Sequence, residues 1–200
     1  FNWLRARIRV AEITAKNAVA AALFYSNTEN GGKSIGGLQH LVADAPTTGT
    51  VGGIDSSSFA FWQSVAYSGV TNGGAAVSAA NIQAYMTTLG LRCVRGSDMP
   101  DLWVADNTYY TYYEGSQVSL KRYNDKSMAD GGFTGLKYKN ADVLFDSTLS
   151  GITATRMYFL NTQYLYLVVH RDADLEVMDD VRPVNQDGSV TPILWMGNLV

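Results

Sequence analysis

The helical periodicity of the first segment constrains the fold most strongly. Apolar residues recur there at alternating steps of four and three, and charged residues lie off that stripe. The apolar positions are Leu4, Ile8, Ala11, Ala15, Ala18 and Ala22. The pattern predicts a helix from about Trp3 to Tyr25, which would span roughly 34 Å at 1.5 Å per residue. Its alanine-rich face favours close packing against a flat sheet, with Leu4, Ile8 and Ala15 toward that sheet.

A glycine-rich stretch follows, ENGGKSIGGLQHLV from Glu29 to Val42, and its Gly-Lys-Ser resembles part of a phosphate-binding loop. The P-loop pattern requires a glycine where this chain has Asn27, and it requires a preceding strand rather than a helix. Spacing and context therefore exclude that motif. We expect a connection that ends the helix, with glycines at positive φ.

The middle of the chain alternates loops with regular elements. Gly36–Gly69 is predicted to be irregular, and a second helix is predicted from Gly74 to Leu89 with Gly90 as its C-terminal cap. Leu102–Ala105 is a short buried strand. Asp106 is then the N-cap of a third helix, formed by NTYYTYYEG and lying across the sheet.

The last third is predicted to be mainly strands, because β-branched and aromatic residues concentrate between turn residues. The expected strands are Gly135–Lys139, Asp142–Asp146, Met157–Leu160, Tyr164–Val169 and Pro192–Leu199. The resulting fold class is α+β.

Composition limits the functional classes. The chain is 46% hydrophobic and carries a net charge of -3, so a folded core is expected and no polyanionic partner is required. Cys93 is the only cysteine, which excludes an internal disulfide and fits a reducing compartment. No apolar run is long enough for a membrane span, so a soluble chain without membrane partners is expected.

Hydrolytic chemistry would have to use His40 or His170, the two histidines. Neither lies near a nucleophile-elbow pattern, and Ser34 and Ser116 are in unsuitable settings. A packed or surface role is the favoured interpretation for both histidines, and we expect no catalytic site.

The run HRDADLEVMDD, His170–Asp180, is the most metal-like feature of the chain. Counted from Asp172, however, an EF-hand would need a glycine at the position of Val177. We expect no metal ion on Asp172, Asp174 and Glu176, and favour a solvated loop that meets basic residues of a partner subunit.

A cluster of four tyrosines could in principle stack nucleic-acid bases. The cluster is Tyr109, Tyr110, Tyr112 and Tyr113, and its nearest basic residues are Lys121 and Arg122. Base-stacking sites interleave aromatic and basic residues, which is not the case here. A helix half-buried at a domain or subunit surface is the favoured interpretation.

Three segments carry a resemblance to a known family. They are GGLQHLVADAPTTGTVGGIDSSSFAFW (Gly36–Trp62), RMYFLNTQYLYLVVH (Arg156–His170) and VRPVNQDGSVTPILWMGNL (Val181–Leu199), and GFTGLKYKNADVLFDS (Gly132–Ser147) also fits in order. Together they resemble the major capsid (coat) protein of a group of tailed bacteriophages. The resemblance runs over most of the chain.

The resemblance implies a fold with a long spine helix, a peripheral domain and an axial domain. Residues 1–75 would hold the spine helix, part of the peripheral domain and the glycine-rich connection. Residues 76–180 would form mainly the axial domain, and residues 181–200 the return strand to the peripheral domain. Family members also carry an N-terminal arm and an extended loop before the spine helix, so we expect that upstream residues are missing here.

The implied function is structural: a subunit that self-assembles into hexamers and pentamers of an icosahedral capsid. The shell would form in the host cytoplasm and enclose double-stranded DNA without specific recognition, with no enzymatic activity and no cofactor. A sequence pI near 5.3 agrees with weak genome binding. The alternatives are a small hydrolase using His40 or His170, and an aromatic-lined binding module. Without the reaching arms, we expect a monomer or small oligomer.

Overall fold

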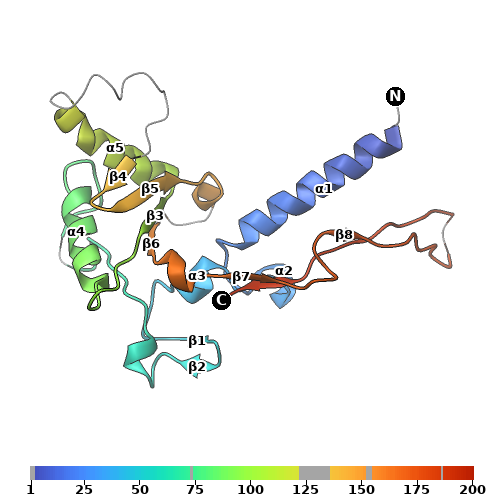
Figure 1. Cartoon of the computed structure of the whole chain (residues 1–200), viewed down its shortest axis with the longest axis horizontal. Helices are drawn as coiled ribbons and strands as arrows, with labels where there is room; N and C mark the ends of the chain where they lie inside the picture. The colour runs from blue at the N-terminus through green and yellow to red at the C-terminus, as the bar shows by residue number, and fades with distance from the viewer. Residues whose placement is uncertain (1–2, 73, 122–135, 152–154, 186) are drawn as a thin grey trace. The chain divides into compact units, whose positions relative to one another are not determined.

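The computed structural model describes residues 3–72, 74–121, 136–151, 155–185 and 187–200 (Figure 1). The chain mixes helix and sheet, with 34% helical and 20% strand residues, so the expected α+β class agrees at this level. It divides into two compact units: Phe1–His40 together with Tyr166–Val200, and Leu41–Leu165.

The chain passes from one unit to the other after His40 and again after Leu165. The chain returns to the first unit at Tyr166 because β7 (Leu167–Val169) pairs antiparallel with β10 (Gly197–Leu199). The chain also enters the second unit early, since Asp44 forms an ion pair with Arg156 at 2.9 Å. Tertiary contacts therefore accompany both changes of unit.

Helix α1 (Trp3–Ala22) confirms the predicted long helix, although it ends before Tyr25. The predicted orientation of Ile8 toward a sheet is wrong, because its side chain is 42% exposed. None of the α1 side chains that the structure describes is buried, and the half-buried ones are Ala6, Glu12, Ala15, Val19, Ala21 and Ala22. The side chain of Leu4 lies outside the description. Periodicity thus identified the helix but not the face that the chain covers.

Two short helices, α2 (Glu29–Gly32) and α3 (Leu38–Leu41), follow α1. Gly31 and Gly32 have φ values of 69° and 81°, as expected for the glycine-rich connection. Gly37 has a different role: a Cβ there would lie 2.4 Å from the carbonyl oxygen of Ala22 and 2.6 Å from that of Leu23. The connection therefore needs Gly37 for a close backbone approach.

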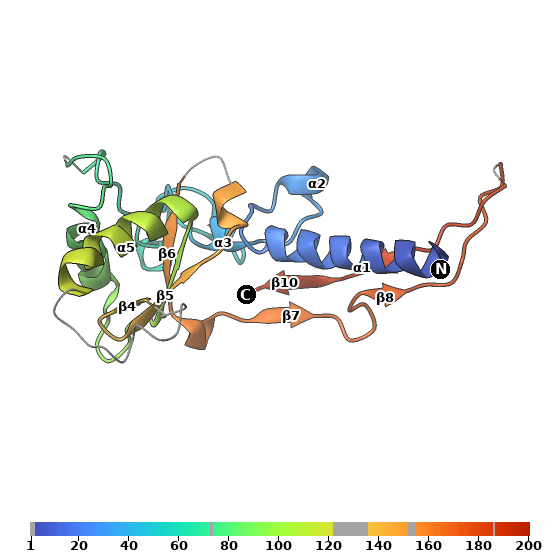
Figure 2. The ribbon, with the colours of Figure 1, turned by 90° about the horizontal axis from the view of Figure 1, so that it is seen from above.

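A long hairpin completes the first unit. Its strands β8 (Glu176–Val177) and β9 (Ile193–Leu194) pair antiparallel, and the ladder resumes at Val181 and Val190 (Figures 1 and 2). The predicted strand Pro192–Leu199 is therefore two strands, β9 and β10, separated by Trp195 and Met196. The N–H of Met196 bonds to the carbonyl of Ala173 at this break.

The second unit holds a four-stranded sheet in the order β4-β5-β3-β6. The strands are β4 (Leu136–Tyr138), β5 (Ala141–Phe145), β3 (Leu102–Ala105) and β6 (Met157–Leu160). Strand β3 runs parallel to β5 and antiparallel to β6. Its predicted bounds are confirmed, as are those of β6. Residue 135 of the predicted strand Gly135–Lys139 lies outside the described residues.

Helices α4 (Ile82–Cys93) and α5 (Asn107–Lys121) supply side chains to the core beside this sheet. The core contains Ile82, Met86, Trp103, Tyr113, Leu136, Ala141 and Val143. The expected cap of α5 is confirmed, since Asp106 Oδ1 accepts a hydrogen bond from the N–H of Tyr109 at 2.8 Å. Helix α5 thereby starts directly after β3.

The bounds predicted for α4 are wrong at both ends. The helix begins at Ile82 rather than Gly74, because the Tyr85 hydroxyl bonds to both the N–H and the carbonyl of Ala75 and holds that residue outside the helix. Gly90 lies inside the helix, which ends at Cys93.

The stretch predicted to be irregular is largely so. Besides α3 it contains the two-residue strands β1 (Thr50–Val51) and β2 (Ile54–Asp55) and the 3-10 helix η1 (Ala60–Trp62). Two further 3-10 helices, η2 (Leu149–Gly151) and η3 (Thr162–Tyr164), lie in the second unit.

Candidate self-association surface

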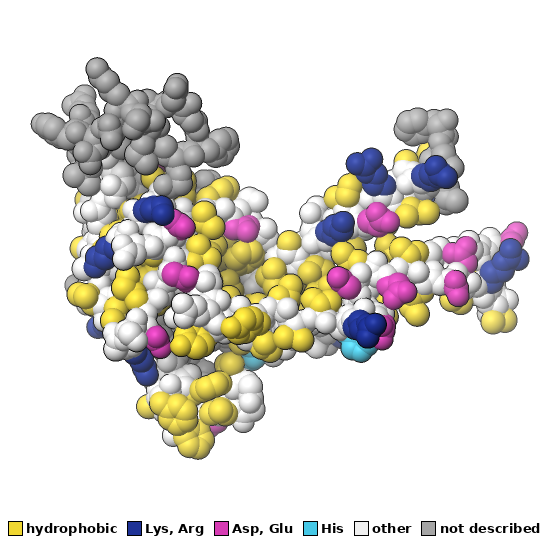
Figure 3. Space-filling view, in the orientation of Figure 1, with side chains coloured by type: hydrophobic (Ala, Val, Ile, Leu, Met, Phe, Trp, Pro, Cys, Tyr) yellow, Lys and Arg dark blue, Asp and Glu magenta, His cyan; other side chains and the backbone are white. Residues whose placement is uncertain are grey.

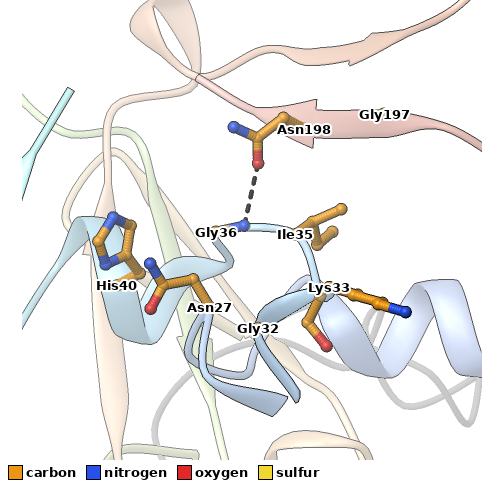
Figure 4. Close-up of a pocket in the computed structure, with 9 residues that line it drawn as sticks. Asn27, Gly32, Lys33, Ile35, Gly36, His40, Gly197 and Asn198 are labelled. Carbon is orange, nitrogen blue, oxygen red and sulfur yellow. Dashed lines mark hydrogen bonds between the residues drawn. The ribbon is translucent and has the colours of Figure 1, made fainter. Parts of the chain in front are cut away.

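A polar hollow of about 310 Å³ lies in the first unit, where the glycine-rich connection meets β10 (Figure 4). Asn198 Oδ1 accepts a hydrogen bond from the N–H of Gly36 at 2.9 Å and so ties the connection to the strand. The hollow is lined by Asn27, Gly32, Lys33, Ser34, Ile35, Gly36, His40, Gly197 and Asn198. A Cβ at Gly36 would lie 3.0 Å from His40 Cδ2, so the first glycine of this pair is tightly packed beside the hollow.

His40 and Ser34, both weighed for hydrolysis, line this hollow together. The Ser34 hydroxyl accepts a hydrogen bond from Asn30 Nδ2 at 3.2 Å. No hydrogen bond joins Ser34 to His40 in the part of the chain that the structure describes. The two side chains are therefore near each other but are not arranged as a nucleophile and its base.

The other two candidates for hydrolysis have local structural contacts. His170 Nδ1 accepts a hydrogen bond from the N–H of Asp172 at 3.2 Å, within the turn after β7. The Ser116 hydroxyl donates to the carbonyl of Tyr113 and accepts from Gln83 Nε2, which links α5 to α4.

The acidic run His170–Asp180 forms the turn after β7 and the first strand of the hairpin. Asp172, Asp174 and Glu176 are all exposed. Within the described ranges, no three His, Cys, Asp or Glu side chains gather closely enough to hold a metal ion.

The tyrosine helix α5 packs against the core of the second unit, which confirms the half-buried interpretation. Tyr113 is 1% exposed, and its hydroxyl donates to the carbonyl of Lys137 at 2.7 Å. Burial of the phenol raises the pKa of Tyr113 to about 12. Tyr109, Tyr110 and Tyr112 are partly buried against the same core. These rings therefore contribute to packing rather than forming an open stacking platform.

Apolar side chains remain exposed on α1. Trp3, Val10 and Ile13 are spaced by seven and three residues, so they share one helix face, and they are 63%, 63% and 50% exposed. This face points away from the half-buried positions Ala15, Val19 and Ala22. A 20-residue helix with apolar residues on its open face indicates an interaction surface.

The hairpin that carries β8 and β9 also presents apolar side chains to solvent. The exposed residues are Val177, Met178, Val181, Val184 and Val190. A two-stranded ribbon buries little of its own surface and is marginally stable in isolation. The hairpin therefore resembles α1 in offering apolar area that the described chain leaves uncovered.

A third exposed apolar group lies beside β1 and β2 in the second unit, where Figure 3 shows hydrophobic side chains gathered. Phe59, Phe61 and Trp62 pack edge to face, and Trp62 Nε1 donates to the carbonyl of Val51 at 3.0 Å. Phe61 is 68% exposed. The sequence analysis overlooked this group, although three aromatic residues within FAFW in a polar loop were a usable signal.

None of the described helices is long and apolar enough to cross a membrane. Among the described residues, exposed apolar side chains gather on α1, on the hairpin and beside β1 and β2. Comparisons with protein-family models, with curated proteins and with solved structures gave no match for this chain.

Proposed function

We propose that this chain is a structural subunit whose function is self-association, and that it is a major capsid protein of the tailed-phage type. Copies would form hexamers and pentamers of an icosahedral shell around double-stranded DNA. The observation that carries the proposal is the exposed apolar face of α1 together with the exposed apolar residues of the hairpin. Exposed apolar side chains that gather on one surface usually mark a site of contact with another protein.

The mixed helix-and-sheet class of the chain supports the proposal at a coarse level. In this proposal, helix α1 would be the spine helix, the rest of the first unit would belong to the peripheral domain and the second unit would be the axial domain. The second unit has its own core around Trp103 and Tyr113, so it can keep its shape while the first unit makes contacts.

A hydrolase is less well supported. His170 Nδ1 bonds within its own turn, and His40 lines the polar hollow. No nucleophile is hydrogen-bonded to either side chain in the described part of the chain. Exposed apolar residues, in contrast, require an explanation that an isolated small enzyme does not supply.

The test is assembly of the complete encoded protein, including any residues before Phe1. Sedimentation velocity and electron microscopy should show large regular particles, whereas the chain Phe1–Val200 should sediment as a monomer or small oligomer. A complete protein that remains a small single species at all concentrations would refute the proposal. Turnover of an ester or peptide substrate that depends on His40 or His170 would favour the hydrolase.

A further inference from the structure

The two exposed elements of the first unit carry opposite charge. Helix α1 contains four basic residues and one acidic residue, whereas residues 172–194 contain six acidic residues and one basic residue. Figure 3 shows Lys and Arg side chains along the helix, and Asp and Glu side chains along the hairpin. The acidic hairpin, defined here as residues 172–194, and α1 are therefore electrostatically complementary.

On α1 the charge lies beside apolar surface. Arg9 and Lys16 are seven residues apart and share a face, and Ile13 lies four residues after Arg9 and three before Lys16. All three side chains are exposed. Neither Arg9 nor Lys16 forms an ion pair with another residue that the structure describes. The helix thus presents a basic stripe bordered by Ile13 and Val10.

The acidic hairpin combines the same two features with opposite sign. Val177 is paired with Ile193 and Val181 with Val190, so one more residue lies between the pairs on the first strand than on the second. The first strand therefore has a β-bulge between the two pairs, in the segment that includes Asp179 and Asp180. Bulges bend a strand and redirect its side chains.

Hydrogen bonding stabilises the bulge, since the Thr191 hydroxyl donates to Asp180 Oδ1. Glu176 and Asp179 remain exposed beside Val177 and Met178. The hairpin therefore presents carboxylates next to apolar side chains, as α1 presents basic groups next to Ile13.

We propose that the acidic hairpin of one copy docks along the basic stripe of α1 in a neighbouring copy. This inference rests on the proposed function and specifies its contact. The apolar residues Ile13 and Val177 would supply the buried area, while Arg9 and Lys16 facing Glu176 and Asp179 would set register and suppress incorrect pairings.

A second copy explains both surfaces at once. A nucleic-acid partner would be repelled by the acidic hairpin, and it would leave the apolar residues of both elements uncovered. A helix-to-hairpin contact joins different patches on the two copies, so it can repeat around a ring or shell.

Charge reversal tests the contact in the complete encoded protein. One variant carries Arg9→Glu with Lys16→Glu, and the other carries Glu176→Lys with Asp179→Lys. Each variant alone would place like charges opposite one another, and we expect its half-assembly concentration in 0.15 M salt to rise by about tenfold or more. The effect should shrink in 1 M salt, where the Debye length is about 3 Å.

Mixing the two variants provides the decisive measurement. In the mixture, a reversed helix can meet a reversed hairpin and a native helix can meet a native hairpin, so rings with an even number of copies contain no like-charge contact. The half-assembly concentration should therefore fall back toward the wild-type value. A contact within one chain could not be restored by mixing. The control Arg95→Glu with Lys139→Glu makes, in the second unit, the same change in net charge as the helix variant, and it should assemble like the wild type.

The possible outcomes separate the two proposals. If the wild type assembles but the reversals have no more effect than the control, the docking contact is wrong and the proposed function stands. If reversals weaken assembly and mixing does not restore it, although each variant keeps its cooperative thermal transition, the contact between copies is also refuted. If the wild type never assembles, the proposed function itself fails.

Discussion

Trp103 and Phe159 stack face to face across neighbouring strands, with ring centroids 3.9 Å apart and planes 10° from parallel. The two residues are direct partners in the register of β3 and β6. This contact joins the last strand of the sheet to the buried center of the second unit. The stability of that unit should therefore depend on both rings.

Substitution of these rings gives the first prediction. Trp103→Ala should lower the free energy of unfolding by about 3–5 kcal/mol, because Trp103 is 1% exposed and its removal leaves a cavity. Phe159→Leu keeps apolar volume but loses the stacking, so a loss of about 1 kcal/mol is expected. Urea denaturation measures both, with Phe61→Leu as an exposed control. Equal losses for Trp103→Ala and Phe61→Leu would contradict this account of the core.

The second prediction concerns Asp106, the N-cap of α5. Asp106→Ala removes the acceptor for the N–H of Tyr109 and should cost about 1 kcal/mol of stability. Asp106→Asn keeps an acceptor and should retain most of the cap. Thermal unfolding of both variants at neutral pH checks the difference, and an Asn variant as unstable as the Ala variant would argue against capping.

Asp106 also predicts a pH dependence. Burial raises the pKa of this carboxyl in the folded state, against opposing hydrogen bonds from the N–H groups of Tyr109 and Thr108. The folded state therefore holds its proton to a higher pH than the unfolded state. Stability relative to Asp106→Asn should fall as pH rises from the unfolded pKa to the raised folded pKa, and then level off. If the stability of the wild type relative to Asp106→Asn instead increased with pH, the raised pKa of Asp106 would be contradicted.

Asp101 should show the opposite dependence. Hydrogen bonds from the hydroxyl and the N–H of Thr162 lower the pKa of its carboxyl. Its contribution should be present above the unfolded pKa and should be lost as pH falls through the folded pKa. Acid titration of stability, compared with Asp101→Asn, measures this effect, and an unchanged acid profile would contradict it.

Tyr113 provides a spectroscopic prediction. Because burial raises its pKa to about 12, absorbance titration should reveal a tyrosine that ionises in this range and disappears in Tyr113→Phe. The same substitution removes the hydrogen bond to the carbonyl of Lys137 and should cost about 0.5–1.5 kcal/mol. Persistence of the late titration in the variant would assign it to another tyrosine.

The last prediction distinguishes two glycines of the first unit. Gly37→Ala would place a Cβ within 2.6 Å of carbonyl oxygens of Ala22, Leu23 and Tyr25, so the connection after α1 must shift. A loss of about 1–3 kcal/mol is expected from such overpacking. Gly188→Ala is the matched control, since no atom lies within 4 Å of the added Cβ. Its stability should stay within about 0.5 kcal/mol of the wild type.

Local signals were sufficient for several elements. The strand Leu102–Ala105 and the cap at Asp106 were predicted correctly, because a short apolar run followed by an N-cap residue depends only on neighbours in the chain. The periodicity of α1 likewise identified a long helix from Trp3 onward. Each of these features depends on residues that are close to one another in the sequence.

Contacts between distant residues decided the rest. The Tyr85 hydroxyl bonds to Ala75 and keeps it outside α4, and the pairing of β7 with β10 brings Tyr166 back to the first unit. The bulge at Asp179 depends on register with a strand that follows in the sequence.

The candidate surface was likewise predictable from the sequence only in part. Composition alone placed basic residues on the first helix and acidic residues in the run His170–Asp180, and it suggested a basic partner for that run. It could not show that Ile13 and Val177 remain exposed beside those charges. Exposure is decided by which surfaces the rest of the chain covers, and that depends on tertiary packing rather than on the periodicity of any one segment.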